Sequence, residues 1–354
     1  MINTFNPEVR LAIHDLDKVG PAIPLENYEA ALRAILTGKA SPVETASFLA
    51  SLHLTKAEEV PDILMQTVQI LKSYSTPIAN IEMVSPRFVD IVGTGGDGHN
   101  TFNVSTASAI VAAGAGLWVC KHGNKASTSA SGSADLLMSF GCDLLNVTPK
   151  NIVSITEQCK FSFLFAPMCH PTLKNVAPIR KQLGLPTIFN LVGPLLNPIP
   201  TYARIIGVSK LSLGEVVAKT LLKLGAGRSL VVCGEEGLDE ISPAGPTHTW
   251  LVRDGTITHE VYTPESFHLQ SHPLSSVASG TPSANAILLE ELLSNMLHAN
   301  HPILDYVLMN TAALLHVAGM AESLREGVKI AQQSISSGAA LRELSNFSTI
   351  SQQP

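Results

Sequence analysis

The sequence has little charge and lacks the long runs and pairings that define several classes of protein. Charged residues make up 15% of its 354 residues, and the formal net charge is −6 at pH 7. No dense stripe of Lys and Arg is present. The chain as a whole therefore does not attract nucleic acid or an anionic membrane, and any anion must be bound at a local site.

Other absences concern compartment and membranes. No run approaches the ~20 apolar residues of a membrane span, and residues 1–10 lack the apolar core of a signal peptide. The five cysteines form no Cys-x-x-Cys pair, and their number is odd. We expect reduced, mostly buried thiols in a cytoplasmic protein. The hydrophobic fraction of 45% excludes a disordered chain, and the length allows one large and one smaller domain.

Residues 88–106 are the most informative stretch. Residues 88–92 predict a short buried strand, the loop Gly93-Thr94-Gly95-Gly96-Asp97-Gly98 follows directly, and the alanine-rich residues 107–115 predict a helix. Glycines let backbone N–H groups turn toward phosphate oxygens, and a helix N-terminus favours anions. This stretch therefore predicts a site for a phosphorylated ligand.

The glycine loop is open to other interpretations. Gly93, Gly95 and Gly98 match the dinucleotide pattern G-x-G-x-x-G, but residues 110–118 contain no Asp or Glu to hold a ribose. Asp97 would repel a pyrophosphate unless a sugar hydroxyl or a metal ion lay between them. It fits better as an acceptor near a polyhydroxylated, metal-bound phosphate. The NTPase loop G-x-x-x-x-G-K-[ST] is absent, and a glycine turn without a ligand is the remaining alternative.

A second polar segment follows the next predicted strand, residues 117–120. Lys121 and Lys125 can neutralise phosphate, and Ser133 can cap the helix that follows. Further hydroxyl donors are Ser127, Thr128 and Ser129. The alternative is a flexible serine-rich loop. Both loops follow predicted strands, and α/β sheets bind ligands at the carboxyl ends of their strands.

The chain divides into two parts by its hydrophobic pattern. Its first ~80 residues predict only helices, with Ser41-Pro42-Val43-Glu44 as one capping box and Thr55-Lys56-Ala57-Glu58 as a second. From Phe88 onward strands and helices alternate. Further strands are predicted at residues 162–165, 204–208 and 230–233, and antiparallel ones at 249–252 and 256–261. The pattern predicts a helical domain followed by an α/β domain.

Several short segments, in order and spacing, resemble those of the anthranilate phosphoribosyltransferase family. They are Gly93-Thr94-Gly95-Gly96-Asp97, Asn103-Val104-Ser105-Thr106, Lys121-His122-Gly123-Asn124, His170-Pro171, Arg180-Lys181-Gln182-Leu183-Gly184, Thr187-Ile188-Phe189-Asn190, Gly193-Pro194-Leu195-Leu196-Asn197-Pro198, Gly237-Leu238-Asp239-Glu240 and Arg325-Glu326-Gly327. The resemblance covers about residues 25 to 345, and the ordered combination is what makes it specific.

The resemblance implies a fold and a domain division. The fold is α/β, with a small all-helical N-terminal domain and a large α/β domain in which helices surround a central, mostly parallel sheet. Residues 1–84 would form the helical domain, completed by about residues 176–200. Residues 85–175 and 201–354 would form the domain that binds 5-phosphoribosyl 1-diphosphate (PRPP).

The resemblance also implies an activity, the transfer of a phosphoribosyl group to anthranilate on the way to tryptophan. Asp239 and Glu240 would carry Mg²⁺, and the Ser105 hydroxyl would contribute to a second metal position. PRPP would be bound by Gly93, Gly96, Asp97, Thr101, Asn103, Val104, Ser105, Thr106, Lys121, Asn124, Lys125, Ala126, Ser127, Thr128, Ser129 and Ser133. Taken alone, an Asp-Glu pair in a loop is usually solvated surface.

Anthranilate would be bound by Gly93, Asn124, His170 and Arg180. Arg180 offers a bidentate partner for a carboxylate, although a lone Arg is more often part of a surface ion pair. Lys121 and His122 are the candidate catalytic side chains. His122 is either a proton acceptor or a histidine in the pocket wall. The family further implies a homodimer joined through the N-terminal helices.

The sequence departs from the family pattern without losing a phosphate loop, a metal carboxylate or Arg180. Lys125 stands where bacterial members usually have Arg, Ala130 where Lys or a polar residue is common, and Pro186 where Arg is common. Three alternatives remain at this point. They are a pyrimidine nucleoside phosphorylase of related fold, a non-enzymatic relative that binds nucleic acid, and a nicotinamide-dependent dehydrogenase.

Overall fold

A seven-stranded sheet forms the centre of the larger part of the molecule. The computed structural model describes residues 5–81, 87–126 and 131–353. The strand order is β3-β2-β1-β4-β5-β6-β7. The strands are β1 (Phe88–Gly93), β2 (Trp118–Gly123), β3 (Phe161–Phe165), β4 (Ala203–Gly207), β5 (Arg228–Gly234), β6 (Thr247–Arg253) and β7 (Thr256–Tyr262). All seven predicted strands are therefore present, with ends that differ by a few residues at most.

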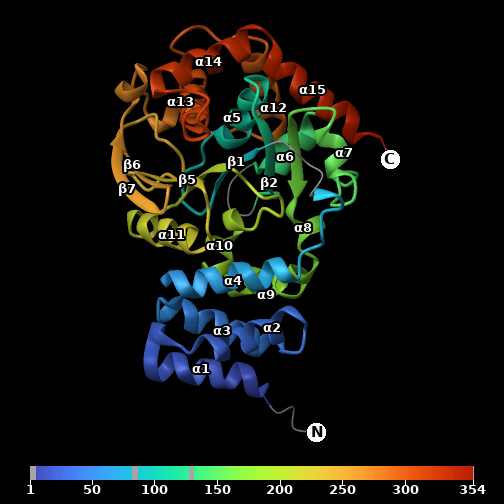
Figure 1. The fold of residues 1–354 in the computed structure, drawn as a ribbon, viewed down its shortest axis with the longest axis vertical. Coiled ribbons are helices and arrows are strands. Elements are labelled where there is room, and N and C mark those ends of the chain that lie inside the picture. The colour runs from blue at the N-terminus through green and yellow to red at the C-terminus, as the bar shows by residue number, and fades with distance from the viewer. Residues whose placement is uncertain (1–4, 82–86, 127–130, 354) are drawn as a thin grey trace.

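The sheet is parallel from β3 to β5 and antiparallel at the β6 and β7 edge. Helices cover both faces, so the predicted α/β fold class is confirmed (Figure 1). The helices of this part are α5 (Val104–Gly114), α6 (Ser133–Ser139), α7 (Ile152–Thr156), α11 (Leu211–Lys223), α12 (Pro282–Leu293), α13 (Pro302–Val317), α14 (Leu324–Ser336) and α15 (Ala339–Ser351).

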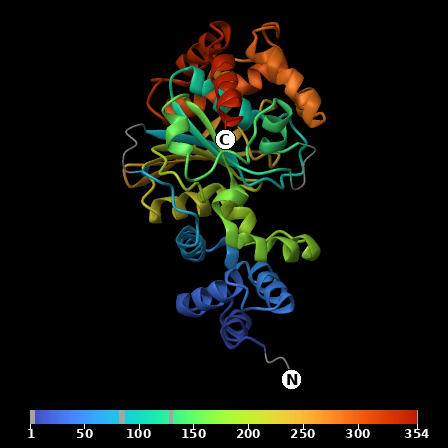
Figure 2. The same cartoon turned by 90° about the vertical axis from the view of Figure 1, so that its right-hand side faces the viewer.

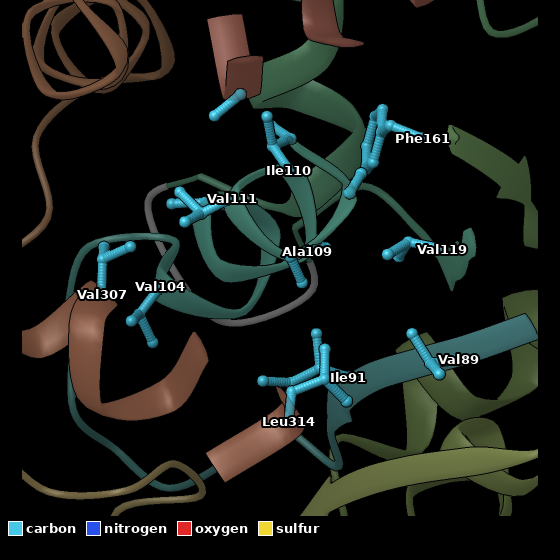
Figure 3. Packing of buried hydrophobic residues seen from close by; sticks show 14 of the residues in the cluster. Val89, Ile91, Val104, Ala109, Ile110, Val111, Val119, Phe161, Val307 and Leu314 are labelled. Atoms are coloured by element: carbon cyan, nitrogen blue, oxygen red, sulfur yellow. The ribbon is translucent and has the colours of Figure 1, made fainter. Parts of the chain in front are cut away.

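The alanine-rich helix α5 lies inside the core. It packs against β1 and β2 on one side and against α13 and α15 on the other. Its alanines are almost fully buried because small side chains let the sheet and two helices approach together. Figure 3 shows Ile110 and Val111 of this helix among Ile91 of β1, Val119 of β2 and Leu314 of α13. This packing fixes the helix whose N-terminus follows the glycine loop.

The smaller part is helical and lies at the N-terminal end of the molecule (Figures 1 and 2). Its first helices are α1 (Pro7–Val19), α2 (Leu25–Leu36), α3 (Pro42–Leu54) and α4 (Pro61–Ser73). Two short helices from the segment between β3 and β4 join them, namely α9 (Ala177–Leu183) and α10 (Ile188–Val192), whereas α8 (Ala166–Cys169) in the same segment contacts β3. Helix α9 contacts α3, and α10 contacts both α3 and α4. These contacts support the predicted completion of the helical domain by residues 176–200, whose boundaries stay a prediction.

One predicted capping box is confirmed and the other is wrong. The Ser41 hydroxyl accepts a bond from Glu44 N at 3.3 Å, and Glu44 accepts one from Ser41 N at 2.6 Å. Thr55 instead ends α3, because its hydroxyl donates to the Ser51 carbonyl at 2.7 Å. Lys56 is left-handed with φ 58°, and a 3₁₀ turn precedes α4.

Two further expectations concern cysteines and membrane spans. All five cysteines are unpaired and buried, as predicted. Within the described residues, no helix is both long enough and apolar enough to cross a membrane.

Candidate active site

A cavity of about 710 Å³ lies at the carboxyl ends of the central strands. Three chain segments surround it, and they follow β1, β2 and β5. Parallel order brings these loops to one edge of the sheet, as the rule for α/β sheets predicts. The lining includes most of the predicted site residues, namely Gly93, Gly96, Asp97, Thr101, Asn103, Ser105, Thr106, Lys121, His122, Asn124, Lys125, Ala126, Ser133, Asp239 and Glu240.

The glycine loop holds the acidic segment in place. Gly95, Gly96 and Gly98 have φ of +67°, +77° and +77°, which side chains rarely allow. The Gly95 N–H donates to Asp239 Oδ2 at 2.6 Å. Gly93 must lack a side chain as well, because an added Cβ would overlap the Asp239 carboxylate. Gly207, at the end of β4, similarly makes room for the Asp239 main chain.

Acidic side chains crowd together at this edge. Burial, and then the charge of Asp97, raises the pKa of Asp239 to about 7. Burial and the charge of Asp239 raise the pKa of Glu240 well above its usual range. A divalent cation would relieve this repulsion, and oxygen ligands suit Mg²⁺. The described residues hold no ready-made group of three metal-ligating side chains, so substrate oxygens and water would complete the coordination of a metal here.

Lys121 places a cation beneath the same edge. Its side chain is only 2% exposed, and Nζ donates to the Ile91 carbonyl and, at 3.3 Å, to the Ser105 hydroxyl. Burial lowers the pKa of Lys121, while the charges of Asp90, Glu240 and Asp239 act in the opposite direction. The Lys121 ammonium and the Ser105 hydroxyl are therefore positioned together from β2 and α5.

The loop after β2 is closed by Asp135, one of the small or acidic residues that the sequence places at the end of this loop. The Asp135 carboxylate accepts bonds from Ala126 N at 2.8 Å and Gly132 N at 3.1 Å. Ser133 does not cap α6, contrary to prediction. It is the first residue of that helix, and its hydroxyl donates to the Asn124 carbonyl at 3.2 Å. The predicted donors Ser127, Thr128 and Ser129, like Ala130, lie outside the described residues.

A distant asparagine supports the start of α5. Asn103 Nδ2 donates to the Ser131 carbonyl at 2.7 Å, and Asn103 Oδ1 accepts from Asn285 Nδ2 at 3.0 Å. Asn285 belongs to α12 and lies 182 residues further along the chain. No motif marks it, so sequence reasoning missed it. His99 and Asn100, which also line the cavity, were missed although they lie beside the glycine loop.

Among the described residues, three predicted site residues lie outside the cavity lining. Val104 is buried in the core, and its N–H donates to the Phe102 carbonyl at 2.6 Å. The other two are His170 and Arg180. His170 is buried behind His122, with 3.2 Å between their Nε2 atoms.

Arg180 comes from the inserted helix α9. Its Nη2 donates to Asn190 Oδ1 at 3.2 Å, and its guanidinium lies 5.4 Å from the centre of the Phe189 ring. Both partners come from α10. Burial lowers the pKa of Arg180, and no carboxylate in the described part of the chain opposes that shift. Arg180 is therefore a partly buried cation held by neutral groups, which leaves its charge available to an acidic ligand.

The two buried histidines, His122 and His170, should make the stability of the protein sensitive to acid. Burial, and then the neighbouring His170, lowers the pKa of His122 from 6.5 to about 3, and burial lowers that of His170 to about 4. The unfolded chain therefore binds more protons below pH 6.5, and the free energy of unfolding falls as the pH falls from 6.5 toward 4. At pH 5 the loss reaches about 2 kcal/mol per histidine.

Urea unfolding at pH 7 and pH 5 measures this loss. The double variant His122→Gln, His170→Gln should lose clearly less stability between the two pH values than the unchanged protein. Equal losses in both proteins would contradict the assignment.

Comparison with known proteins agrees with this geometry. Residues 85–341 match the family described as "Glycosyl transferase family, a/b domain". An anthranilate phosphoribosyltransferase from Symbiobacterium thermophilum is 42% identical over 316 residues, which is 89% of this chain and 90% of that protein. The chain belongs to the anthranilate phosphoribosyltransferase family.

Solved structures of this family have the same fold. The anthranilate phosphoribosyltransferase from Saccharomyces cerevisiae in complex with PRPP and Mg has a TM-score of 0.92 and 36% identity, and 98% of each chain is covered. The same yeast enzyme in complex with 4-fluoroanthranilate has a TM-score of 0.88 and 34% identity, again over 98% of each chain. The anthranilate phosphoribosyltransferase fold therefore extends over both parts of this molecule, including the helical one.

Proposed function

We propose that this chain transfers the 5-phosphoribosyl group of PRPP to the amine of anthranilate. The products are N-(5-phosphoribosyl)anthranilate and diphosphate, and the reaction belongs to tryptophan biosynthesis. The proposal rests on one observation. The glycine loop, the Lys121 ammonium and the Asp239-Glu240 pair all line the same cavity. The yeast relative of the same fold is in complex with PRPP and Mg.

The donor would lie along the glycine loop and the loop after β2. The N–H groups of residues 96–98 and the N-terminus of α5 can donate to phosphate oxygens, whereas those of Thr94 and Gly95 donate to Gly207 and Asp239. Lys121 adds a positive charge beneath them. Asp97 would accept hydrogen bonds from the ribose hydroxyls. Residues 124–126 and Ser133 would close over the diphosphate.

Asp239 and Glu240 would hold Mg²⁺, and Ser105 would contribute to a second metal position. When bound, Mg²⁺ supplies positive charge that stabilises the diphosphate. The fit rests on the two crowded carboxylates, whose pKa values are raised in the absence of a cation. Their oxygen atoms are the ligands that this hard ion prefers.

The acceptor would lie between the cavity and the inserted helices. Arg180 would pair with the anthranilate carboxylate, and Asn124 and the Gly93 backbone would bind the amine side. His122 lines the cavity, and His170 supports it from behind. In this arrangement the carboxylate of anthranilate faces a cation, and its amine faces neutral hydrogen-bonding groups.

The reaction needs charge stabilisation more than strong base catalysis. Breaking the C1–diphosphate bond leaves positive charge on the ribose ring and negative charge on the diphosphate, which Lys121 and the loop N–H groups stabilise. The amine attacks C1 from the opposite face and inverts the configuration. An aromatic amine is neutral at pH 7, so positioning supplies much of the rate. Burial lowers the pKa of His122 to about 3, so this side chain is a weak base and serves as part of the pocket wall.

Loss of anthranilate fluorescence on addition of PRPP and Mg²⁺ tests the activity. One diphosphate should form per anthranilate consumed. Phosphate-dependent cleavage of a nucleoside, without diphosphate release, would point to a nucleoside phosphorylase instead. A reducing compartment would keep the five buried thiols unpaired, and we place the enzyme in the cytoplasm on that ground.

We further propose a homodimer joined through the N-terminal helices. Large apolar side chains are exposed on these helices, and Val43 and Leu54 of α3 are 70% and 78% exposed. The same region also exposes Phe5, Leu11, Val19 and Leu25. A second copy meeting this face would cover them in an isologous contact. No proposed site residue lies on these helices, so each subunit should hold a complete site.

Light scattering at micromolar concentration should give twice the chain mass of 37.6 kDa. The double variant Val43→Glu, Leu54→Glu should be monomeric and keep its activity. Met296→Glu is a matched control, because Met296 is 73% exposed but lies far along the chain. A mass of one chain for the unchanged protein would refute the dimer. An inactive monomer would show that the sites depend on each other.

A further inference from the structure

A row of three polar side chains connects the cavity to the end of α4. His122 Nε2 lies 3.2 Å from His170 Nε2, and His170 Nδ1 lies 2.8 Å from the Ser75 hydroxyl. His122 is in the cavity lining, His170 is buried behind it, and Ser75 is partly exposed. The row therefore runs from the site to the chain segment that leaves the helical part.

The Ser75 end of this row is fixed to the main chain. The Ser75 hydroxyl also donates to the Leu71 carbonyl in the last turn of α4, at 3.0 Å. The next residue, Thr76, donates its N–H to the Cys169 carbonyl at 2.8 Å. The segment carrying Ser75 is thus bound to the segment carrying His170, and the position of the hydroxyl is set by a helix.

The Ser75 hydroxyl is one of the groups that orient the two rings, together with the main chain of Gly193 at His122 and of Leu196 at His170. Both histidines are neutral at pH 7, because burial lowers their pKa values. A neutral imidazole has one donor and one acceptor nitrogen, so a bond at one nitrogen fixes the role of the other. The rings lie 82° apart in an edge-to-face contact, with 5.0 Å between their centres. Removing the Ser75 hydroxyl would leave His170 Nδ1 without this partner and allow the His170 ring, and through it the His122 contact, to shift.

We propose that Ser75 is a positioning residue for the acceptor, acting through His170 on His122. The inference rests on the proposed function, since it assigns His122 to the anthranilate side of the cavity. Ser75 touches neither substrate. Its effect should therefore fall on anthranilate rather than on PRPP, whose partners lie on the glycine loop, on α5 and on Lys121.

Steady-state kinetics of Ser75→Ala tests the proposal. Loss of one hydrogen bond to a buried group should raise the KM for anthranilate about 3- to 10-fold, with the KM for PRPP changed less than about 2-fold. Ser75→Thr keeps the hydroxyl and should restore the KM. Ser75→Cys keeps the size but replaces the hydroxyl by a thiol, which forms only weak hydrogen bonds. It should behave like Ser75→Ala and provides a second variant if the alanine protein folds poorly.

The matched control is Ser73→Ala. The Ser73 hydroxyl donates to the Ile70 carbonyl at 2.7 Å in the same turn of α4, and no contact joins it to His170 among the described residues. Ser73→Ala should leave both KM values unchanged. An equal rise of the anthranilate KM in both alanine variants would overturn the proposal, because loss of a helix-end bond would then explain it.

A double-mutant cycle with His170→Phe tests whether Ser75 acts on His122 through His170 or by a local effect of its own. In the His170→Phe background, Ser75→Ala should change the anthranilate KM by less than about 1.5-fold. A full effect of Ser75→Ala in that background would overturn the route through His170. Failure of the unchanged protein to consume anthranilate with PRPP would instead refute the proposed function, so the two failures are distinct.

Discussion

Replacing Asp239 by Asn and Glu240 by Gln together is expected to lower kcat by about 100- to 1,000-fold at saturating Mg²⁺. Two negative metal ligands are lost, and with them much of the stabilisation of the departing diphosphate. The fold should remain, because the amides keep the size of the carboxylates and the Gly95 N–H can still donate to an oxygen at position 239. Steady-state kinetics at several Mg²⁺ concentrations measures the effect.

Thermal unfolding gives an independent measure of the same site. In the absence of Mg²⁺ the double variant should be at least as stable as the unchanged protein, because the repulsion between Asp97 and Asp239 is removed. The rise in melting temperature with Mg²⁺ and PRPP should be smaller in the variant. Glu235→Gln, at an exposed carboxylate in the same loop, is the control. Rates like those of the unchanged protein would rule out the metal role.

Arg180→Ala is expected to raise the KM for anthranilate at least about 30-fold and the KM for PRPP only slightly. The substrate carboxylate would be left in a partly desolvated pocket without its cation. This costs several-fold more binding free energy than the loss of an exposed ion pair. The structure makes this charge available, because Asn190 and Phe189 hold the guanidinium without neutralising it.

The neighbouring Lys181 offers a matched control. It is exposed on the same short helix, so Lys181→Ala removes a positive charge without touching the pocket. Its effect on either KM should be less than about 2-fold. Equal effects of Arg180→Ala on both substrates would contradict the assignment to anthranilate.

Local patterns in the sequence predict much of this site. Gly93 to Gly98 between a strand and a helix indicated an anion loop, and the structure places that loop at the cavity. Strand positions were also predictable, because buried strands in a parallel sheet are short apolar runs. Lys121 could be expected there since it directly follows the predicted strand 117–120, and parallel strands present their carboxyl ends at one edge.

Contacts between distant segments could not be predicted in this way. The bond between Asn285 and Asn103 spans 182 residues, and that between Ser75 and His170 spans 95. Neither pair has a periodicity or a motif that connects its members. The error at Thr55 has a different cause. A Thr followed by polar residues can either begin a helix or end one. Here Lys56 is left-handed, and Thr55 therefore ends α3 instead of beginning the next helix.

The insertion between β3 and β4 has a consequence for synthesis of the protein. Helices α3 and α4 leave the ribosome early, but the helices α9 and α10 that pack on them follow only after β1, β2 and β3. The N-terminal helices must therefore wait for more than 100 further residues before their surface is covered. At about 5–20 residues per second this delay lasts roughly 5 to 25 seconds. During that time the nascent chain exposes an apolar surface to chaperones, and a truncated message ending before α9 would yield a product prone to aggregation.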